Sequence, residues 1–128
     1  MRVLLDTCSF LWFIAGDDKL SRPAKKLIAD LDNQMLVSVA SLWEIALKVK
    51  LGKLTLLRPF EELIPRQLTL SEIDKLPIEL NHLTLLTQLP WHHGEPFERL
   101  IIAQALAEAL PVISHNDIYK KYQIQIIW

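Results

Sequence analysis

The chain has 128 residues, 51% of them hydrophobic, and its 14 Lys and Arg residues against 15 Asp and Glu residues give a formal net charge of −1. This balance lacks the broadly basic surface of a dedicated DNA-binding domain, and the scarcity of glycine excludes a low-complexity or disordered chain. A single cysteine excludes an internal disulfide and a cysteine-based zinc site. The uncharged stretch at 7–16 is too short to span a membrane. We therefore expect one cytoplasmic domain over residues 1–128.

Apolar runs of strand length alternate with helical patterns along the chain. Ser21 is a suitable N-cap for the helix that follows it, and Gly52 suits the end of the strongest helical pattern. Such alternation predicts an α/β sandwich with a mainly parallel sheet. The expected strands are 3–5, 35–38, 75–78, 111–114 and 124–127, and the expected helices are 10–15, 22–30, 40–51, 59–68 with an interruption at Pro65, 80–89, 96–109 and 117–121.

Two acidic residues occupy positions where a carboxylate needs an explanation. Asp6 directly follows the first strand, at the edge of the sheet where ligands of α/β proteins bind, although it can equally cap the next helix. Glu44 belongs to a helix that is apolar in nearly every direction, so we expect the helix to be buried and its thin polar stripe of Ser41, Glu44 and Lys48 to line a cleft or an interface. The alternatives for Glu44 are a capping box with Ser41 and an i,i+4 ion pair with Lys48.

Glu98 raises the same question from a third element. It lies near the start of a long helix, above a core-facing stripe, whereas Gln104 and Glu108 are expected on the solvent side. The alternative is that Glu95 caps this helix and Glu98 is a first-turn carboxylate that complements the helix dipole.

Asn116 and Asp117 follow the fourth strand and supply the fourth candidate, although a helix cap would also explain them. Four carboxyl or amide groups at strand ends or on buried helix faces are more than capping requires. Together they predict an oxygen-rich site for a hard divalent cation, Mg²⁺ or Mn²⁺. Such an ion can activate water beside a phosphoryl group, so the expected reaction class is phosphodiester hydrolysis.

Several segments, in order along essentially the whole chain, resemble one known family. They are Leu4–Thr7, Ser38–Ala46 followed by Leu51–Leu54, Leu76–Ile78, Pro90–His93 before Pro96 and Phe97, Arg99–Ala105, and Tyr122–Trp128. On these segments the sequence resembles the PIN domain family and, within it, the VapC-like toxins of bacterial type II toxin-antitoxin systems.

The resemblance implies a three-layer α/β/α fold around a mainly parallel sheet of about five strands, and a Mg²⁺- or Mn²⁺-dependent ribonuclease that acts on RNA. It also implies a cognate antitoxin protein as partner, and we expect a homodimer. The acidic quartet of the family carries over to Asp6, Glu44 and Glu98, the expected catalytic residues and metal ligands. The fourth ligand position falls on Asn116 or Asp117.

The sequence departs from the family pattern at two places. Where relatives usually have Asp-Pro-Phe-Asp, this chain has Glu95 and Glu98 around the same Pro-Phe pair, and the usual fourth aspartate falls on Asn116, with Asp117 one place later. Longer carboxylates can still ligate, but Mg²⁺ requires near-octahedral geometry. The competing hypothesis is therefore a PIN module with a weakened site that binds a protein or RNA partner.

Other positions are predicted to be structural. Cys8 is expected to be a small buried residue, and His92 and His93 are expected to be packing or solvated groups. Basic side chains gather at 22–26 and at 48–53. If RNA is the ligand these are local contact candidates, but the favoured interpretation is ordinary solvated surface.

Overall fold

A parallel sheet of five strands, in the order β3-β2-β1-β4-β5, forms the centre of the structure, which is a computed structural model describing residues 1–128. The α/β fold class and the number of strands expected from the sequence are confirmed. The strands are β1 (Arg2–Leu5), β2 (Gln34–Ser38), β3 (Ile73–Leu76), β4 (Val112–Ile113) and β5 (Ile126–Ile127).

Successive side chains of the central strands enter two separate cores. Val3 and Leu5 of β1 belong to one buried cluster, whereas Leu4 belongs to the other. In β2, Val37 joins the cluster of Val3, and Leu36 joins the cluster of Leu4. Because side chains alternate along a strand, an apolar run of this kind requires a covering layer on both faces of the sheet.

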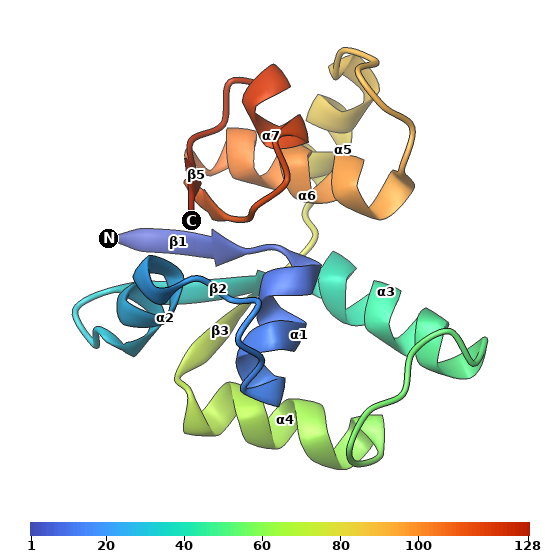
Figure 1. The fold of residues 1–128 in the computed structure, drawn as a ribbon. Helices are drawn as coiled ribbons and strands as arrows, with labels where there is room; N and C mark the ends of the chain where they lie inside the picture. The colour runs from blue at the N-terminus through green and yellow to red at the C-terminus, as the bar shows by residue number, and fades with distance from the viewer.

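Helices supply both covering layers, which gives three layers (Figure 1). Figure 1 shows α5, α6 and α7 together on one side of β1, and α1, α2 and α4 on the other side. The helix α3 borders both cores, because Ala40 packs in one cluster and Ile45 in the other. The helices are α1 (Thr7–Ala15), α2 (Arg22–Ala29), α3 (Val39–Lys50), α4 (Phe60–Leu70), α5 (Leu80–Gln88), α6 (Pro96–Ala107) and α7 (Ile118–Lys121).

Two helices differ from their predicted bounds for local reasons. The helix α1 begins at Thr7 rather than Phe10, because the Asp6 side chain accepts a hydrogen bond from the backbone N–H of Ser9 and caps the helix. The helix α4 continues through Pro65, where an interruption was expected. Pro65 lacks only the N–H that would bond to the carbonyl of Glu61, and that turn is exposed, so water can replace the bond.

Other helices and strands also begin or end at residues that differ from the predicted ones. The helix α6 stops at Ala107 because Ala109 adopts a left-handed φ of 52° and Leu110 donates its N–H to the carbonyl of Ala105. The strand β3 starts at Ile73, two residues earlier than predicted, where Ile73 pairs with Met35 of β2. The last strand is shorter than expected and covers Ile126–Ile127 alone.

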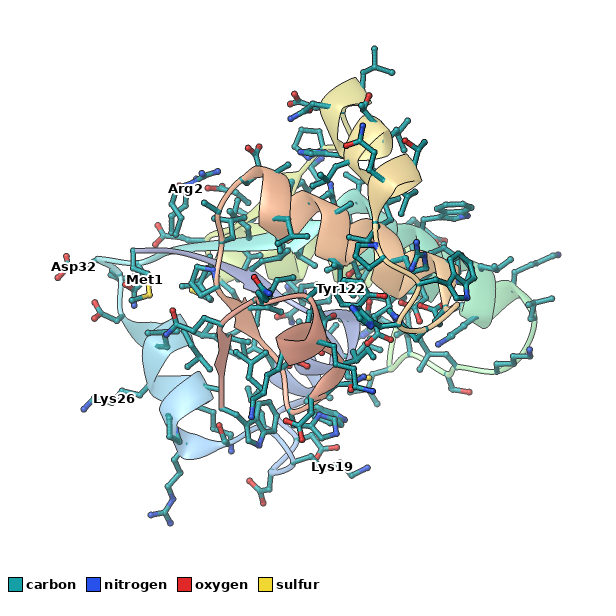
Figure 2. All side chains as sticks on the ribbon, turned by 90° about the horizontal axis from the view of Figure 1, so that it is seen from above. Met1, Arg2, Lys19, Lys26, Asp32 and Tyr122 are labelled. Carbon is teal, nitrogen blue, oxygen red and sulfur yellow. The ribbon has the colours of Figure 1, made fainter.

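The expectation that α3 is buried on nearly all sides is wrong. Trp43 is 56% exposed and Leu47 is 40% exposed, so one apolar face of this helix meets solvent. The basic side chains of α2 are largely exposed, and Figure 2 shows Lys26 directed away from the body of the molecule. No helix in the structure combines the length and the apolar character that crossing a membrane requires.

Gln104 was expected on the solvent side of α6, and this is wrong because its side chain is fully buried. Its Oε1 accepts a hydrogen bond from the Ser38 hydroxyl at the end of β2, and its Nε2 donates to the carbonyl of Pro77 at 3.1 Å. This amide therefore joins α6 to the carboxyl ends of β2 and β3.

We predict that Gln104→Leu lowers the free energy of unfolding by about 1–3 kcal/mol, because a side chain of similar size leaves the buried Ser38 and Pro77 groups without their partner. Chemical denaturation measures this change. The matched control is Gln88→Leu at the exposed end of α5, where a change within about 0.5 kcal/mol is expected. Equal stability of the two variants would contradict the bridging role of Gln104.

Candidate functional site

A cavity of about 240 Å³ lies at the carboxyl ends of β1 and β4. Four carboxylates line it: Asp6 after β1, Glu44 from α3, and Glu95 and Glu98 from the start of α6. Asn116 contributes from the loop after β4. The structure thus brings together residues that are up to 110 positions apart in the sequence.

Asp6 is both a helix cap and a wall of the cavity. Its Oδ1 accepts the Ser9 N–H at 2.8 Å, and the residue is only 7% exposed. Burial raises the pKa of the Asp6 carboxyl, and hydrogen bonds from Ser114 and Ser9 oppose this shift. The two interpretations of Asp6 in the sequence are therefore compatible, because one oxygen caps α1 while the residue also borders the cavity.

Glu44 is held by groups on two helices. Its Oε1 lies 2.7 Å from the Thr7 hydroxyl, and its Oε2 lies 2.6 Å from Nζ of Lys48, the predicted ion pair. The predicted capping box with Ser41 does not form, because Ser38 caps α3 through the N–H of Ala40. The Thr7 contact was not foreseen, since no sequence spacing predicts which side chain of α1 faces α3.

Glu98 is a half-buried carboxylate whose ionisation is opposed by its surroundings. Its pKa is raised to about 7, first by burial and then by repulsion from Glu95, Asp6 and Glu44. Glu95 has the predicted capping role, since its carboxylate accepts the backbone N–H groups of Phe97 at 3.3 Å and of Glu98 at 2.5 Å. Glu98 therefore lies close to a second acid that the fold fixes in place.

The amide of Asn116 faces Glu98, whereas Asp117 faces solvent. Asn116 Oδ1 accepts the backbone N–H of Ile118 at 3.0 Å, so its Nδ2 is the atom that lies 2.8 Å from Glu98 Oε1 and donates to it. Asp117 does not line the cavity, and its carboxylate pairs with Lys120 at 3.2 Å on the surface. As the side chains stand, Asn116 supplies a hydrogen-bond donor at this position and Asp117 supplies nothing.

Cys8 differs from expectation, and His93 differs only in part. Cys8 is exposed at the edge of the cavity, where it was expected to be buried. Partial burial of its thiol, followed by repulsion from Asp6 and Glu44, raises the thiol pKa. His93 packs against Tyr122, as expected of a packing residue, but its Nε2 also lies 4.0 Å from Glu98.

The composition of the cavity fits a hard divalent cation. Carboxylates dominate its polar lining, and Lys48 is already paired with Glu44. Burial and then repulsion from three carboxylates raise the pKa of Glu98, and a divalent cation would offset both effects. No three His, Cys, Asp or Glu side chains are close enough together, as they stand, to hold one ion. The donors therefore suit Mg²⁺ or Mn²⁺ by chemistry, and binding would require their side chains to converge.

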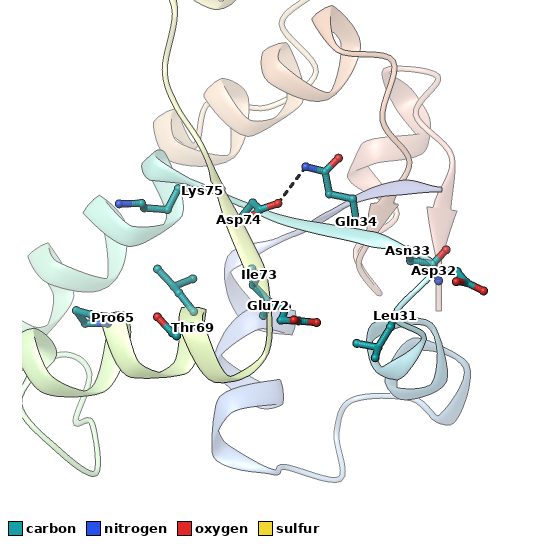
Figure 3. Close-up of a pocket in the computed structure, with 11 residues that line it drawn as sticks. Leu31, Asp32, Asn33, Gln34, Pro65, Thr69, Glu72, Ile73, Asp74 and Lys75 are labelled. Atoms are coloured by element: carbon teal, nitrogen blue, oxygen red, sulfur yellow. Dashed lines mark hydrogen bonds between the residues drawn. The ribbon is translucent and has the colours of Figure 1, made fainter.

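The largest cavity of the fold, about 730 Å³, lies elsewhere (Figure 3). It opens at the amino ends of β2 and β3, where Gln34 donates to Asp74 at 3.0 Å. Its acidic residues, Asp32, Glu72 and Asp74, are all exposed. Size alone would select this cavity, but all of its acids are exposed, whereas the smaller cavity contains the buried Asp6 and the half-buried Glu44 and Glu98.

The family model for the PIN domain matches residues 3–124. The chain belongs to the PIN domain family. No curated protein matches the sequence of this PIN domain.

Solved structures share the fold of this PIN domain. A chain of VapBC2 from Rickettsia felis, crystallised with a DNA fragment from the promoter, superposes with a TM-score of 0.74 at 15% identity and covers 100% of this chain and 99% of that chain. DNA-bound VapBC from Salmonella typhimurium superposes with a TM-score of 0.72 at 17% identity, and the match covers 99% of this chain and 97% of that chain. FitAcB from Neisseria gonorrhoeae superposes with a TM-score of 0.66 at 16% identity, and the match covers 100% of this chain and 97% of that chain. At these identities the likeness establishes the fold.

We predict that, without metal, the unchanged protein loses stability relative to the Glu98→Gln variant as pH rises from 4.5 to about 7. The quantity compared is the free energy of unfolding of the two proteins. The folded state keeps the Glu98 proton in this range, whereas the unfolded chain, with the usual pKa of 4.5, has released it, so ionisation costs stability. After allowance for solvent screening we expect the difference to reach about 2 kcal/mol above pH 7.

Chemical denaturation in EDTA at several pH values measures this difference. Glu61→Gln on the exposed surface of α4 is the control, and its curve should run parallel to that of the unchanged protein. A difference between the Glu98→Gln and unchanged curves that stays constant from pH 4.5 to 8 would show that Glu98 titrates normally.

Proposed function

We propose that this chain is a metal-dependent ribonuclease and the VapC-like toxin of a type II toxin-antitoxin pair. The observation that carries this proposal is the cavity at the carboxyl edge of the sheet, where Asp6, Glu44, Glu95 and Glu98 lie together. Burial and the three neighbouring carboxylates raise the pKa of Glu98 to about 7, in keeping with this concentration of acids. Concentrated negative charge of this kind suits a divalent cation, and PIN-domain nucleases generally use divalent metals.

Asp6, Glu44 and Glu98 would hold Mg²⁺ or Mn²⁺. A bound cation of this type supplies activation of water and stabilisation of charge that develops on a phosphoryl group. The chain itself supplies orientation: Thr7 fixes Glu44, and Asn116 fixes one oxygen of Glu98. The Ser9 N–H holds Asp6 at the end of β1. RNA is the proposed substrate.

The proposed partner is a cognate antitoxin protein. Support comes from the solved structures with the same fold, among them a toxin-antitoxin complex from Klebsiella pneumoniae. An arginine side chain of such a partner would pair with the carboxylates of the cavity, because its planar guanidinium matches carboxylate geometry. A homodimer in the cytoplasm is part of the same proposal, and light scattering would measure the oligomeric state.

A second candidate, a PIN module that binds a partner without cleaving RNA, is favoured by two observations. No three ligand groups are preassembled, and the fourth position presents an amide N–H rather than a carboxylate. Millimolar Mn²⁺ distinguishes the two functions, because a ligand that binds the folded state raises the melting temperature. A melting temperature and an RNA substrate that both stay unchanged would favour the binding module.

Asp6→Asn tests the nuclease. We expect RNA cleavage to fall by more than about 100-fold, beyond the range typical of losing a partner of a metal ligand. Asn caps helices as well as Asp does, and it removes a buried charge, so stability without metal should stay equal or rise. Cleavage of labelled RNA in Mn²⁺ and thermal unfolding in EDTA are the two measurements.

Asp17→Asn is the matched control, because Asp17 follows α1 and does not line the cavity. Its cleavage rate should equal that of the unchanged protein. A large loss of stability in Asp6→Asn with cleavage intact would mean that Asp6 serves only as a cap.

Asn116→Asp should lower the Mn²⁺ concentration needed for half-maximal cleavage and should lower the melting temperature in EDTA. The substitution replaces an N–H donor 2.8 Å from Glu98 with a second negative charge, which repels Glu98 until a cation balances both. In the unchanged protein we expect Mn²⁺ to support cleavage better than Mg²⁺, whose geometry is stricter.

Asp117→Asn is the control for this experiment and should change neither quantity, since Asp117 pairs with Lys120 on the surface. If Asn116→Asp has no effect while Asp117→Asn eliminates cleavage, Asp117 is the ligand and the loop after β4 turns by one residue in the active protein.

A further inference from the structure

The loop between α5 and α6 is organised around one buried cation, Arg99. Its Nη1 donates to the carbonyls of Pro90 at 3.0 Å and His93 at 3.2 Å, and its Nη2 donates to the carbonyl of Leu89 at 3.2 Å. The guanidinium also lies 4.1 Å from the Trp91 ring. No carboxylate pairs with Arg99, so this arginine shapes the loop rather than balancing the acidic cavity.

Arg99 also contacts the hydroxyl of Tyr122, which lies within the interior of the molecule near the centre of Figure 2. The Tyr122 oxygen accepts Arg99 Nη1–H at 3.2 Å and the backbone N–H of His92 at 3.2 Å. Both of these groups can only donate. The third neighbour is Nδ1 of His93 at 3.0 Å, so the Tyr122 proton has one acceptor, and it is that nitrogen.

A neutral imidazole has a single N–H group. Because Nδ1 of His93 accepts from Tyr122, the proton of the ring must lie on Nε2. This Nε2 is buried without a hydrogen-bond partner and lies 4.0 Å from Oε2 of Glu98. The other oxygen of Glu98, Oε1, already accepts from Asn116. A buried donor without a partner thus faces the one oxygen of Glu98 that Asn116 leaves free.

We propose that His93 is a positioning residue for Glu98: Tyr122 and Arg99 hold its ring as the Nε2–H tautomer, and this N–H bonds to Oε2 of Glu98. The separation of 4.0 Å is too long for a hydrogen bond, so the contact forms when the Glu98 side chain moves toward a divalent cation. Hydrogen bonds to ligating carboxylates orient them and raise metal affinity. The role in metal binding rests on the proposed function, whereas the tautomer does not.

The tautomer is measured by NMR on protein labelled with ¹⁵N-histidine, in EDTA at pH 8. The two ring nitrogens of His93, assigned by comparison with His93→Gln, should show Nε2–H in the unchanged protein. Tyr122→Phe removes the donated proton and should give a mixture of both tautomers. An Nδ1–H form in the unchanged protein, or an unaltered spectrum in Tyr122→Phe, would overturn the proposal.

Two substitutions test the contact with Glu98. Glutamine can place its amide nitrogen near the position of Nε2, whereas the shorter asparagine can reach only the position of Nδ1. We expect Mn²⁺ affinity, measured as free Mn²⁺ by electron paramagnetic resonance, to fall by about 10- to 100-fold in His93→Asn and to be largely retained in His93→Gln. His92→Asn, at the exposed neighbouring residue, should bind Mn²⁺ as the unchanged protein does.

Melting temperatures in EDTA show whether each variant is folded. Equal Mn²⁺ affinities in folded His93→Asn and His93→Gln would overturn the positioning role and leave the proposed function standing. No Mn²⁺ binding by the unchanged protein would overturn the proposed function itself.

Discussion

Burial of β1 on both faces is the constraint on which the rest of the structure depends. With Leu4 in one core and Val3 and Leu5 in the other, the strand needs helices above and below it. Helical connections make every strand parallel, and the carboxyl ends of the strands therefore meet at one edge. Asp6 is the first polar residue after this strand, so the position of the acidic cavity follows directly from the apolar run before it.

The acidic cavity opposes folding, and the surrounding structure compensates for it locally. Each of the three predicted ligand carboxylates receives a hydrogen bond or ion pair from a neighbour: Asp6 from Ser9, Glu44 from Lys48 and Glu98 from Asn116. Burial, and then repulsion from Glu95, Asp6 and Glu44, still raise the pKa of Glu98 to about 7, so these contacts offset the two effects only in part. Such residual repulsion is typical of sites whose geometry serves a ligand rather than stability.

The sequence predicted the layers and the sheet because hydrophobic alternation depends on backbone periodicity alone. Side-chain direction on a helix depends on its neighbours in space, and the predictions were wrong where this mattered. Gln104 has no polar neighbour in sequence that reveals its buried contacts with Ser38 and Pro77. Likewise, the turn after β4 decides whether Asn116 or Asp117 faces inward, and the sequence left both possible. The roles of Asp6, Glu44 and Glu98 as metal ligands, with Asn116 or Asp117 at the fourth position, stay predictions.

The position of Cys8 has a consequence for the chemical durability of the chain. Its thiol is the only one in the sequence, and it lies at the edge of the cavity beside Asp6 and Glu44. Partial burial and then the charges of these two residues raise the thiol pKa. Oxidants and alkylating agents react with the thiolate, so this exposed sulfur is mostly in its less reactive form at neutral pH. Partial burial and the negative field of the cavity thus together protect the one thiol of the protein.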